Sequence, residues 1–292
     1  MEIIKCLNNA IEYIEDNLNS SIKVDDIAKV ALTSRYHFQR MFHAITGFTI
    51  TEYIRNRRLT LAGEELTSKD SKIIDIAVKY GYDSPDAFTK AFQRLHGVTP
   101  SMIKKGNVRL KAFPKLSFQI SIKGECEMDY RIVEKDEFKV FGVDFITTEL
   151  NNALYKEIPE FCDRIWEDGT HLKMNQLLGY PRMHMLYGYH YGFKEDGSRS
   201  YMMGWKIPEA GVPKEYKVLD VPASTWAVFE GKGNMEQNLA IQEVWIRIYA
   251  EWFPSSGFEQ VEGPCIEKYD WDDEKYDNYT CEVWIPVRRK KE

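Results

Sequence analysis

The sequence predicts a multidomain protein in which an all-α domain with two helix-turn-helix motifs is followed by an α+β domain with pseudo-twofold symmetry. Its 292 residues suffice for two domains that each bury a core. Residues 1–107 carry 15 Lys+Arg against 13 Asp+Glu and no tryptophan, whereas the remainder carries 24 against 32 and all seven tryptophans. Each part also contains an internal repeat. We therefore expect domains at residues 1–107 and 123–292, joined by a linker at residues 108–122.

The composition indicates a soluble protein of the cytoplasm. Hydrophobic residues make up 43% and charged residues 29% of the chain, as is typical of globular domains. The longest uncharged apolar runs are far shorter than the ~20 residues of a membrane span, and the N-terminus lacks the features of a signal peptide. The five cysteines form no C-x-x-C pair, so we expect neither a disulfide framework nor a zinc site, and no cofactor.

The first domain is predicted to be helical throughout. Residues 3–18 place their apolar side chains on one face with a 3.6-residue period. Apolar residues between positions 24 and 31 and between positions 38 and 45 then define two short amphipathic helices on either side of a tight break. This arrangement is typical of a helix-turn-helix, although a single helical hairpin is weak evidence.

The helix-turn-helix pattern occurs twice. Asp-Ile-Ala at residues 26–28 recurs 49 residues later at residues 75–77. Three further positions recur 50 residues later: Phe38, Phe42 and Gly47 return as Phe88, Phe92 and Gly97. The one-residue difference falls in the predicted turn at residues 80–83, where an insertion costs least. Residues 49–66, between the two copies, are predicted to form one connecting helix.

The outward residues of the second helix in each copy are candidates for DNA contact. They are Arg35, Tyr36, Gln39 and Arg40 in the first copy and Ser84, Asp86, Thr89 and Lys90 in the second. A recognition helix places such side chains in the major groove, where Arg and Gln can contact guanine and adenine edges. The alternative is that these are solvated residues on two core hairpins, and the duplication makes it the weaker interpretation.

Residues 6–105 resemble the tandem helix-turn-helix domain of AraC/XylS transcriptional regulators, especially those of the Rob type. The resemblance is closest over YHFQRMF at residues 36–42 and over FTKAFQRLHGVTP at residues 88–100, which ends in the family's G-x-x-P. It implies that Tyr36, Gln39 and Arg40 contact bases. The chain departs from this branch at Tyr36, where a larger aromatic is usual, and at Asp86, where Gln is common.

The second domain is predicted to contain two copies of a strand-helix-strand-strand unit. Strands, one helix and two further strands cover residues 130–209, and the same order recurs over residues 224–290. The last strands match at a spacing of 78, since residues 201–208 and 279–286 both begin with Tyr and end with Ile-Pro. Two such units predict a pseudo-twofold α+β domain with a groove between its halves.

The second domain resembles GyrI-like small-molecule-binding domains over roughly residues 125–290. The similar stretches are DVPASTWAVFEGKG, IYAEWFPSSGFE and YTCEVWIPVRRK. Such domains also serve as the sensor half of multidrug-responsive regulators. An AraC-type domain followed by a GyrI-like domain is the order found in Rob-type regulators, so the resemblance covers nearly the whole chain.

Glu282 is predicted to carry the ligand chemistry. If Cys281 and Val283 face the core, alternation puts Glu282 and Trp284 on the groove side. A carboxylate among aromatic rings would attract an organic cation, to which the ring faces add cation–π attraction. Gly204 matches Glu282 in the first unit, so the fold does not need the acid twice. The resemblance implies that the Glu at this position is the floor of the ligand pocket. Further candidates for its walls are Tyr187, Tyr189, Trp205 and Trp226.

Together these features predict a sequence-specific DNA-binding transcription regulator, an activator, whose C-terminal domain binds a hydrophobic and cationic small-molecule effector. Its expected partners are double-stranded DNA at promoters, the effector and RNA polymerase, with no membrane, and it would act on the nucleoid. The alternative is that the GyrI-like domain hydrolyses or sequesters a reactive ligand with Glu282, as some stand-alone relatives do. We expect no enzyme, because the sequence has no phosphate-binding glycine loop, metal cluster or spaced Ser/His/Asp set.

Overall fold

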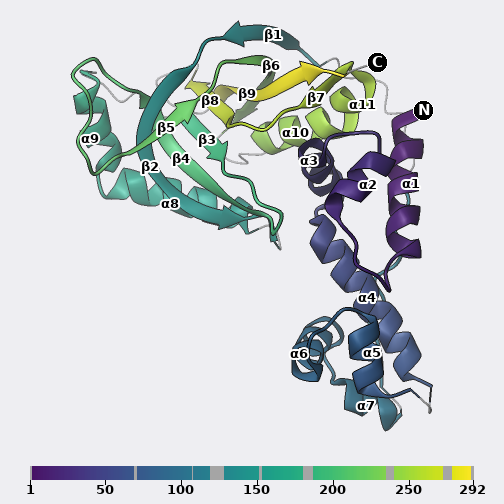
Figure 1. Cartoon of the computed structure of the whole chain (residues 1–292). Coiled ribbons are helices and arrows are strands. Elements are labelled where there is room, and N and C mark those ends of the chain that lie inside the picture. Colours follow the sequence, from purple (N-terminus) through teal and green to yellow (C-terminus); the bar gives the residue numbers. More distant parts are fainter. Residues whose placement is uncertain are drawn as a thin grey trace. The chain divides into compact units, whose positions relative to one another are not determined.

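The computed structural model describes most of the chain and divides it into two compact units (Figure 1). The described residues are 2–68, 71–106, 108–118, 128–150, 153–179, 187–234, 240–271 and 278–290. The first unit comprises Met1–Phe38 with Ile50–Lys123, and the second comprises Gln39–Thr49 with Gly124–Glu292. Residues 119–122 of the predicted linker lie outside the described residues.

The first unit is helical, as the sequence predicts. Its helices are α1 (Glu2–Asp16), α2 (Val24–Val30), α3 (Arg35–Thr46), α4 (Ile50–Leu66), α5 (Ile73–Lys79), α6 (Pro85–His96) and α7 (Pro100–Lys104), of which α3 continues into the second unit. Helices α2 and α3 form one helix-turn-helix and α5 and α6 the other. The connecting helix α4 has 17 residues and spans about 26 Å at 1.5 Å per residue.

The two helix-turn-helix motifs share the same turn and the same cap. Leu32 and Gly81 open the turn with positive φ angles of 52° and 79°. The hydroxyls of Ser34 and Ser84 then accept hydrogen bonds from the backbone amides three residues later, at 3.3 and 3.1 Å. Leu32 and Gly81 are 49 residues apart, whereas Ser34 and Ser84 are 50 residues apart. The extra residue of the second copy therefore lies between positions 81 and 84. This confirms the predicted position of the insertion.

The segment after α7 lies against α1 and α4 as far as it is described. Phe118 exchanges two backbone hydrogen bonds with the side chain of Asn8, both at 2.9 Å. The amide of Leu116 donates to the hydroxyl of Tyr53 at 3.2 Å. Because the extended backbone forms hydrogen bonds with polar side chains of α1 and α4, residues 108–118 form part of the first unit.

The second unit is built on one antiparallel sheet, which has nine strands in the described residues. They are β1 (Tyr130–Lys135), β2 (Phe138–Thr148), β3 (Tyr187–Tyr191), β4 (Ser198–Lys206), β5 (Lys217–Val221), β6 (Ser224–Asn234), β7 (Phe258–Gln260), β8 (Cys265–Trp271) and β9 (Asn278–Arg289). Helices α8 (Leu154–Glu167) and α9 (Thr170–Leu177) follow β2. Helix α10 (Ala240–Arg247), the π turn η2 (Ile248–Trp252) and α11 (Phe253–Ser255) follow β6.

The strand order shows the predicted duplication. It is β1-β6-β9-β8-β3-β4-β2-β5, with β7 paired to β9. The unit β2-α8-β3-β4 recurs as β6-α10-β8-β9, and the two units meet at the β3–β8 pair, about which the inner six strands are symmetric. This confirms the pseudo-twofold α+β fold. Helices α8 and α10 cover the same face of the sheet (Figure 1). The ring of Phe161 on α8 lies 6.1 Å from that of Tyr201 on β4, and the ring of Trp245 on α10 lies 6.0 Å from that of His190 on β3. Tyr201 and His190 are cross-strand neighbours, so both helices contact the same face.

Side chains alternate between a helix-covered face and an opposite face. The cluster on the helix-covered face contains Phe141, Phe161, Ile165, Met174, Tyr201 and Met203. The cluster on the opposite face contains Val140, Tyr189, Met202, Val221, Trp226, Val228 and Ile266. Within the residues that the structure describes, none of the helices combines the length and the apolar character needed to cross a membrane.

Candidate functional site

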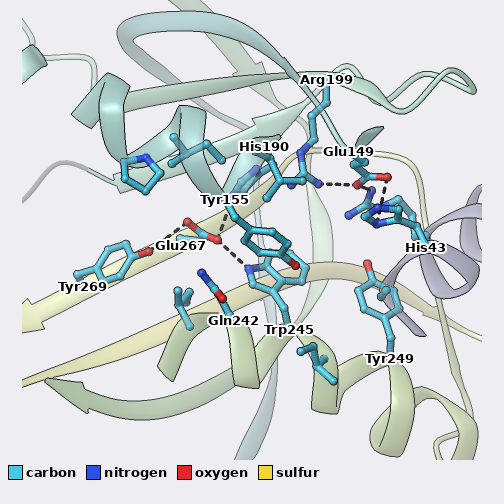
Figure 2. A pocket seen from close by; sticks show the side chains of 17 residues that line it. His43, Glu149, Tyr155, His190, Arg199, Gln242, Trp245, Tyr249, Glu267 and Tyr269 are labelled. Carbon is cyan, nitrogen blue, oxygen red and sulfur yellow. Dashed lines mark hydrogen bonds and ion pairs between the residues drawn. The ribbon is translucent and has the colours of Figure 1, made fainter. Parts of the chain in front are cut away.

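A pocket opens on the helix-covered face of the second unit, between α8 and α10 (Figure 2). Its cavity volume is about 110 Å³, below the ~300–1,000 Å³ of most ligand pockets. The lining combines aromatic and aliphatic side chains of both helices with polar residues of the sheet. Its ionisable and aromatic members are Arg40, His43, Glu149, Tyr155, His190, Arg199, Trp245, Tyr249, Glu267 and Tyr269.

Glu267 on β8 supplies a buried carboxylate to this pocket. Its Oε1 accepts a hydrogen bond from the indole of Trp245 at 2.7 Å, and its Oε2 accepts one from the hydroxyl of Tyr269 at 3.2 Å (Figure 2). Burial alone would raise the pKa of this carboxyl, but the ring of His190, the Trp245 donor and the charge of Arg199 outweigh burial and lower it. Glu267 is therefore an anion at neutral pH.

His190 on β3 lies beside this carboxylate. Its Nε2 is 3.0 Å from Oε1 of Glu267. Burial lowers the pKa of the ring, and this outweighs the attraction of Glu267, so His190 is neutral at pH 7. Its Nδ1 is buried and has no hydrogen-bond partner among the described residues. With His190 neutral, Arg199 supplies the positive charge that acts on Glu267, and Nδ1 of His190 offers a polar atom that a ligand or a water could satisfy.

Glu149, which follows β2, supplies a second carboxylate that two arginines enclose. Arg40 and Arg199 both donate from Nη1 to its Oε1, the latter at 2.9 Å. Nδ1 of His43 lies 3.3 Å from Oε2. The guanidinium carbons of the two arginines lie 4.3 and 5.4 Å from the centroid of the Phe193 ring. We call Arg40, His43, Glu149 and Arg199 the Glu149 cluster.

The Glu149 cluster is an ionised group of buried side chains. Burial alone would raise the pKa of Glu149, but Arg40, Arg199 and His43 outweigh burial and lower it to about 2. Burial lowers the pKa of His43, so this ring is neutral. Arg40 and Arg199 therefore balance Glu149 and Glu267, and the ionisable side chains that line the pocket sum to zero charge.

The six residues predicted to bind ligand do not line this pocket. Glu282, Trp284, Tyr187, Tyr189 and Trp226 belong to the opposite face of the sheet. Trp205 packs against the cluster on the helix-covered face, and its ring lies 4.4 Å from that of Tyr187. Tyr189 and Trp226 are 1% and 0% exposed. Both rings are core residues in this structure, and their role as walls of a ligand pocket stays a prediction.

Glu282 already has partners from its own unit. Its carboxylate accepts hydrogen bonds from Arg131 at 2.6 Å and from the indole of Trp284 at 2.8 Å. The ring of Trp284 has Lys135 Nζ 4.8 Å and the guanidinium of Arg131 5.7 Å from its centroid. Cations of the chain thus stand where the sequence predicts a cationic ligand, and the ligand-binding role of Glu282 stays a prediction.

Strand packing explains why the first unit has Gly204 at the position that matches Glu282 in the second unit. A Cβ at Gly204 would lie 2.5 Å from the carbonyl oxygen of Phe141 on β2, so this position accepts no side chain. The contrast between Gly204 and Glu282 is therefore a consequence of how closely β2 and β4 pack. It carries no information about a function of Glu282.

Sequence reasoning missed Glu149, His190, Arg199 and Glu267. One signal was available for Glu267. In the strand at residues 265–271, alternation puts Glu267 on the same side as Cys265, which is an inward position. A charged residue at an inward position of a buried strand is unusual and marks a candidate site. No comparable local signal marks Glu149 or Arg199.

The predicted DNA contacts of the second helix-turn-helix lie on one surface of α6. Ser84 caps the helix, Asp86 and Lys90 are exposed, and Thr89 is half-buried. The first residues of α3 are also accessible. Arg35 is exposed, with its guanidinium 3.2 Å from Asp25, while Tyr36 and Gln39 are half-buried.

Arg40 differs from the other predicted DNA contacts. It is only 8% exposed and is held by the carboxylate of Glu149. The expectation that Arg40 faces outward is therefore wrong for this structure, since the buried ion pair directs its guanidinium into the pocket. Its contact with a base stays a prediction, which requires the pair to open.

Among the described residues, no group of His, Cys, Asp and Glu side chains is arranged to hold a metal ion. The pocket pairs an anionic carboxylate with aromatic faces, which is the chemistry that recognises an organic cation. Such faces attract cations, by ~0.5–2 kcal/mol depending on how far the site is desolvated.

Two family profiles match the chain. The profile of the integron-associated effector binding protein, Cass2, matches residues 131–287, which is more than half of the chain. A helix-turn-helix domain profile matches residues 27–106.

Individual proteins are similar to one part of the chain or the other. The Tn10 TetD protein of Escherichia coli is 39% identical over 102 residues, 35% of this chain and 74% of its own length. The transcriptional activator AarP of Providencia stuartii is 38% identical over 98 residues, 34% of this chain and 73% of its own length. The structure of SAV2435 bound to tetraphenylphosphonium has 20% identity and a TM-score of 0.45, covering 55% of this chain and 94% of that one.

Proposed function

Since the chain belongs to the family of integron-associated effector binding proteins and is a transcription regulator with an AraC-type helix-turn-helix domain, we propose that the pocket between α8 and α10 is its effector site and takes a hydrophobic organic cation. The observation that carries the proposal is Glu267, a buried carboxylate whose direct partners are the indole of Trp245, the hydroxyl of Tyr269 and the neutral ring of His190, so that among the described residues it has no cationic hydrogen-bond partner. An effector that brings a positive charge would supply that partner.

The surroundings of Glu267 favour an aromatic or bulky cation over a metal ion. Trp245 of α10 and Tyr155 of α8 present rings to the same pocket (Figure 2). Tyr155 and Ile246 are 43% and 50% exposed, so an apolar entrance leads to the carboxylate. Burial of apolar ligand surface contributes roughly 25 cal/mol per Å². The small cavity means that side chains must move before a drug-sized molecule fits.

Tetraphenylphosphonium is a suitable probe, because SAV2435 is described with it bound and because tetraphenylborate has nearly the same shape with the opposite charge. We expect calorimetry to show binding of the phosphonium and no measurable binding of the borate. Glu267→Gln should weaken phosphonium binding at least tenfold. Glu259→Gln, which alters a carboxylate paired with Arg288 on β7, should leave it unchanged. Equal affinity for both probes would show that charge plays no part and would contradict the proposal.

We infer likewise that α3 and α6 bind promoter DNA and that the chain activates transcription together with RNA polymerase in the cytoplasm. The similarity to AarP, a transcriptional activator by name, supports this inference for the helical part. In vitro transcription with purified polymerase and an effector tests it, and repression instead of activation would contradict it.

In this proposal the effector is bound and not consumed, so it should be recovered unchanged after prolonged incubation with the protein.

A further inference from the structure

Arg40 belongs to two sites at once. It lies within α3, the recognition helix of the first helix-turn-helix, and it also lines the pocket proposed for the effector. Both ends of its contact are buried, since the side chains of Arg40 and Glu149 are 9% and 7% exposed. In this state Arg40 cannot reach a base edge, because its guanidinium is directed at the carboxylate and stacked on Phe193.

The charge of the pocket depends on Arg40. With His43 and His190 neutral, Arg40 and Arg199 together balance Glu149 and Glu267. If Arg40 leaves, the lining carries one net negative charge, which a monovalent cation can compensate. While Arg40 stays, an entering cation meets a positive charge in a cavity of low dielectric constant, where repulsion is strong.

The space in the pocket also depends on Arg40. Its cavity of about 110 Å³ is too small for a drug-sized molecule. Arg40, His43 and Ala44 are the part of the lining that comes from α3, whereas the rest comes from residues 149–269. Arg199 lies on β4, whose backbone is paired with β2 on one side and with β3 on the other, so its main chain is held in the sheet. Arg40 is therefore the cation whose departure enlarges the site.

We propose that a cationic effector replaces Arg40 at Glu149, so that filling the pocket makes Arg40 available to DNA. This inference rests on the proposed function, because it takes the pocket to be the site of a cation. It assigns Arg40 the role of a resident cation that occupies the effector site in the absence of effector.

The two binding events are then coupled with a defined sign. The effector and DNA both favour the state in which Arg40 has left Glu149, so each should increase the affinity for the other. Reciprocity requires the same factor in both directions. Couplings of this kind amount to roughly 5- to 150-fold.

The experiment uses the full-length protein and a DNA duplex selected by it from random sequences. Fluorescence anisotropy measures DNA affinity with and without saturating tetraphenylphosphonium. For the wild type we expect the phosphonium to tighten DNA binding at least fivefold. For Glu149→Gln we expect tight DNA binding already without phosphonium, and less than a twofold response to it. Glu259→Gln, the matched control with another Arg-paired carboxylate, should respond as the wild type does.

Replacing Arg40, the resident cation, should change phosphonium affinity in a direction that a purely structural role of Arg40 does not predict. Arg40→Ala should bind phosphonium at least threefold more tightly in calorimetry, because the competing charge is gone. Arg35→Ala, which removes an exposed arginine from the same helix, should leave phosphonium affinity unchanged. Unchanged or weaker phosphonium binding by Arg40→Ala would overturn the competition.

The outcomes separate this inference from the proposed function. If the phosphonium binds to the wild type but leaves DNA affinity unchanged, the competition is wrong and the effector site stands. If the phosphonium does not bind, the proposed effector class is wrong, and the DNA affinity of Glu149→Gln alone decides whether Glu149 sequesters Arg40. If Glu149→Gln binds DNA with the same affinity as the wild type, the inference that Glu149 sequesters Arg40 is overturned. Should Glu149→Gln fail to fold, the wild-type titration still decides.

Discussion

Helices α3 and α6 have the same length and local structure but different surroundings. Both have 12 residues, follow a serine whose hydroxyl accepts an amide hydrogen bond, and bury two phenylalanines four residues apart. Arg40 on α3 and Lys90 on α6 occupy the same position in the repeat. Lys90 is exposed, whereas Arg40 is buried against Glu149. A repeated motif fixes the shape of a recognition helix, while contacts outside the motif decide whether its side chains are available to DNA.

The core of the two motifs should prove equivalent. Phe38 and Phe88 are 1% and 0% exposed at matching positions. We expect Phe38→Ala and Phe88→Ala each to lower the free energy of unfolding by about 3–5 kcal/mol, because each leaves a cavity in a packed core. Urea unfolding followed by circular dichroism measures both. A cost more than twice as large at one position would break the equivalence of the two copies.

Acid should affect the α3 copy selectively. The pKa of Glu149 is about 2 in the folded chain against 4.5 for an unperturbed group. A depressed pKa contributes stability that is complete above pH ~4.5 and is lost as the pH falls toward 2. Its full size is on the order of 3 kcal/mol. Unfolding free energies measured across this range should fall for the wild type, and Glu149→Gln should show a flatter profile.

Substitutions at positions 40 and 90 compare the two helices directly. Without effector, we expect Lys90→Ala to weaken DNA binding and to reduce the salt dependence by about one charge, whereas Arg40→Ala should have little effect. With saturating tetraphenylphosphonium, Arg40→Ala should cost ~1–3 kcal/mol if Arg40 contacts a guanine. Anisotropy titrations at several salt concentrations measure these values. Equal losses at both positions without effector would contradict the burial of Arg40.

The smallest expected effect concerns the helix caps. Ser84 accepts the amide hydrogen bond of Ala87, and Ser34 accepts that of His37. Ser84→Ala and Ser34→Ala should each cost about 1 kcal/mol of stability. Thermal unfolding resolves a difference of this size, and Ser→Gly at the same positions, which should cost only a few tenths of a kcal/mol, serves as the control.

Much of the fold follows from local patterns in the sequence. The helical period of α1 is visible within a few residues, and the two repeats appear as short matching segments, about 50 residues apart for the helix-turn-helix motifs and 78 residues apart for β4 and β9. The placement of the domain boundaries at residues 107 and 123 stays a prediction. The structure groups residues 39–49 with the second unit, which no pattern within α3 indicates. Limited proteolysis with mass spectrometry would locate the accessible connection.

Less of the candidate site than of the fold follows from local patterns in the sequence. Alternation along β9 correctly separates Glu282 and Trp284 from Cys281 and Val283. It does not say which face carries a pocket, because both faces of a covered sheet bear aromatic residues. The family resemblance implies a ligand-binding acid on the last strand, Glu282, which stays a prediction, and the pocket between α8 and α10 contains Glu267 on the strand before it.

The resemblance to two families implies a regulator that combines DNA recognition with a small-molecule sensor. The sequence by itself determined the order of two domains and the duplication in each. These follow from helical and strand periods and from caps, which are encoded by neighbouring residues. Only the tertiary structure decided that Glu149 meets Arg40 and Arg199, which are 109 and 50 residues away in the chain. Ion pairs between such distant residues leave no periodic trace, because one charged residue at each position suffices to form them.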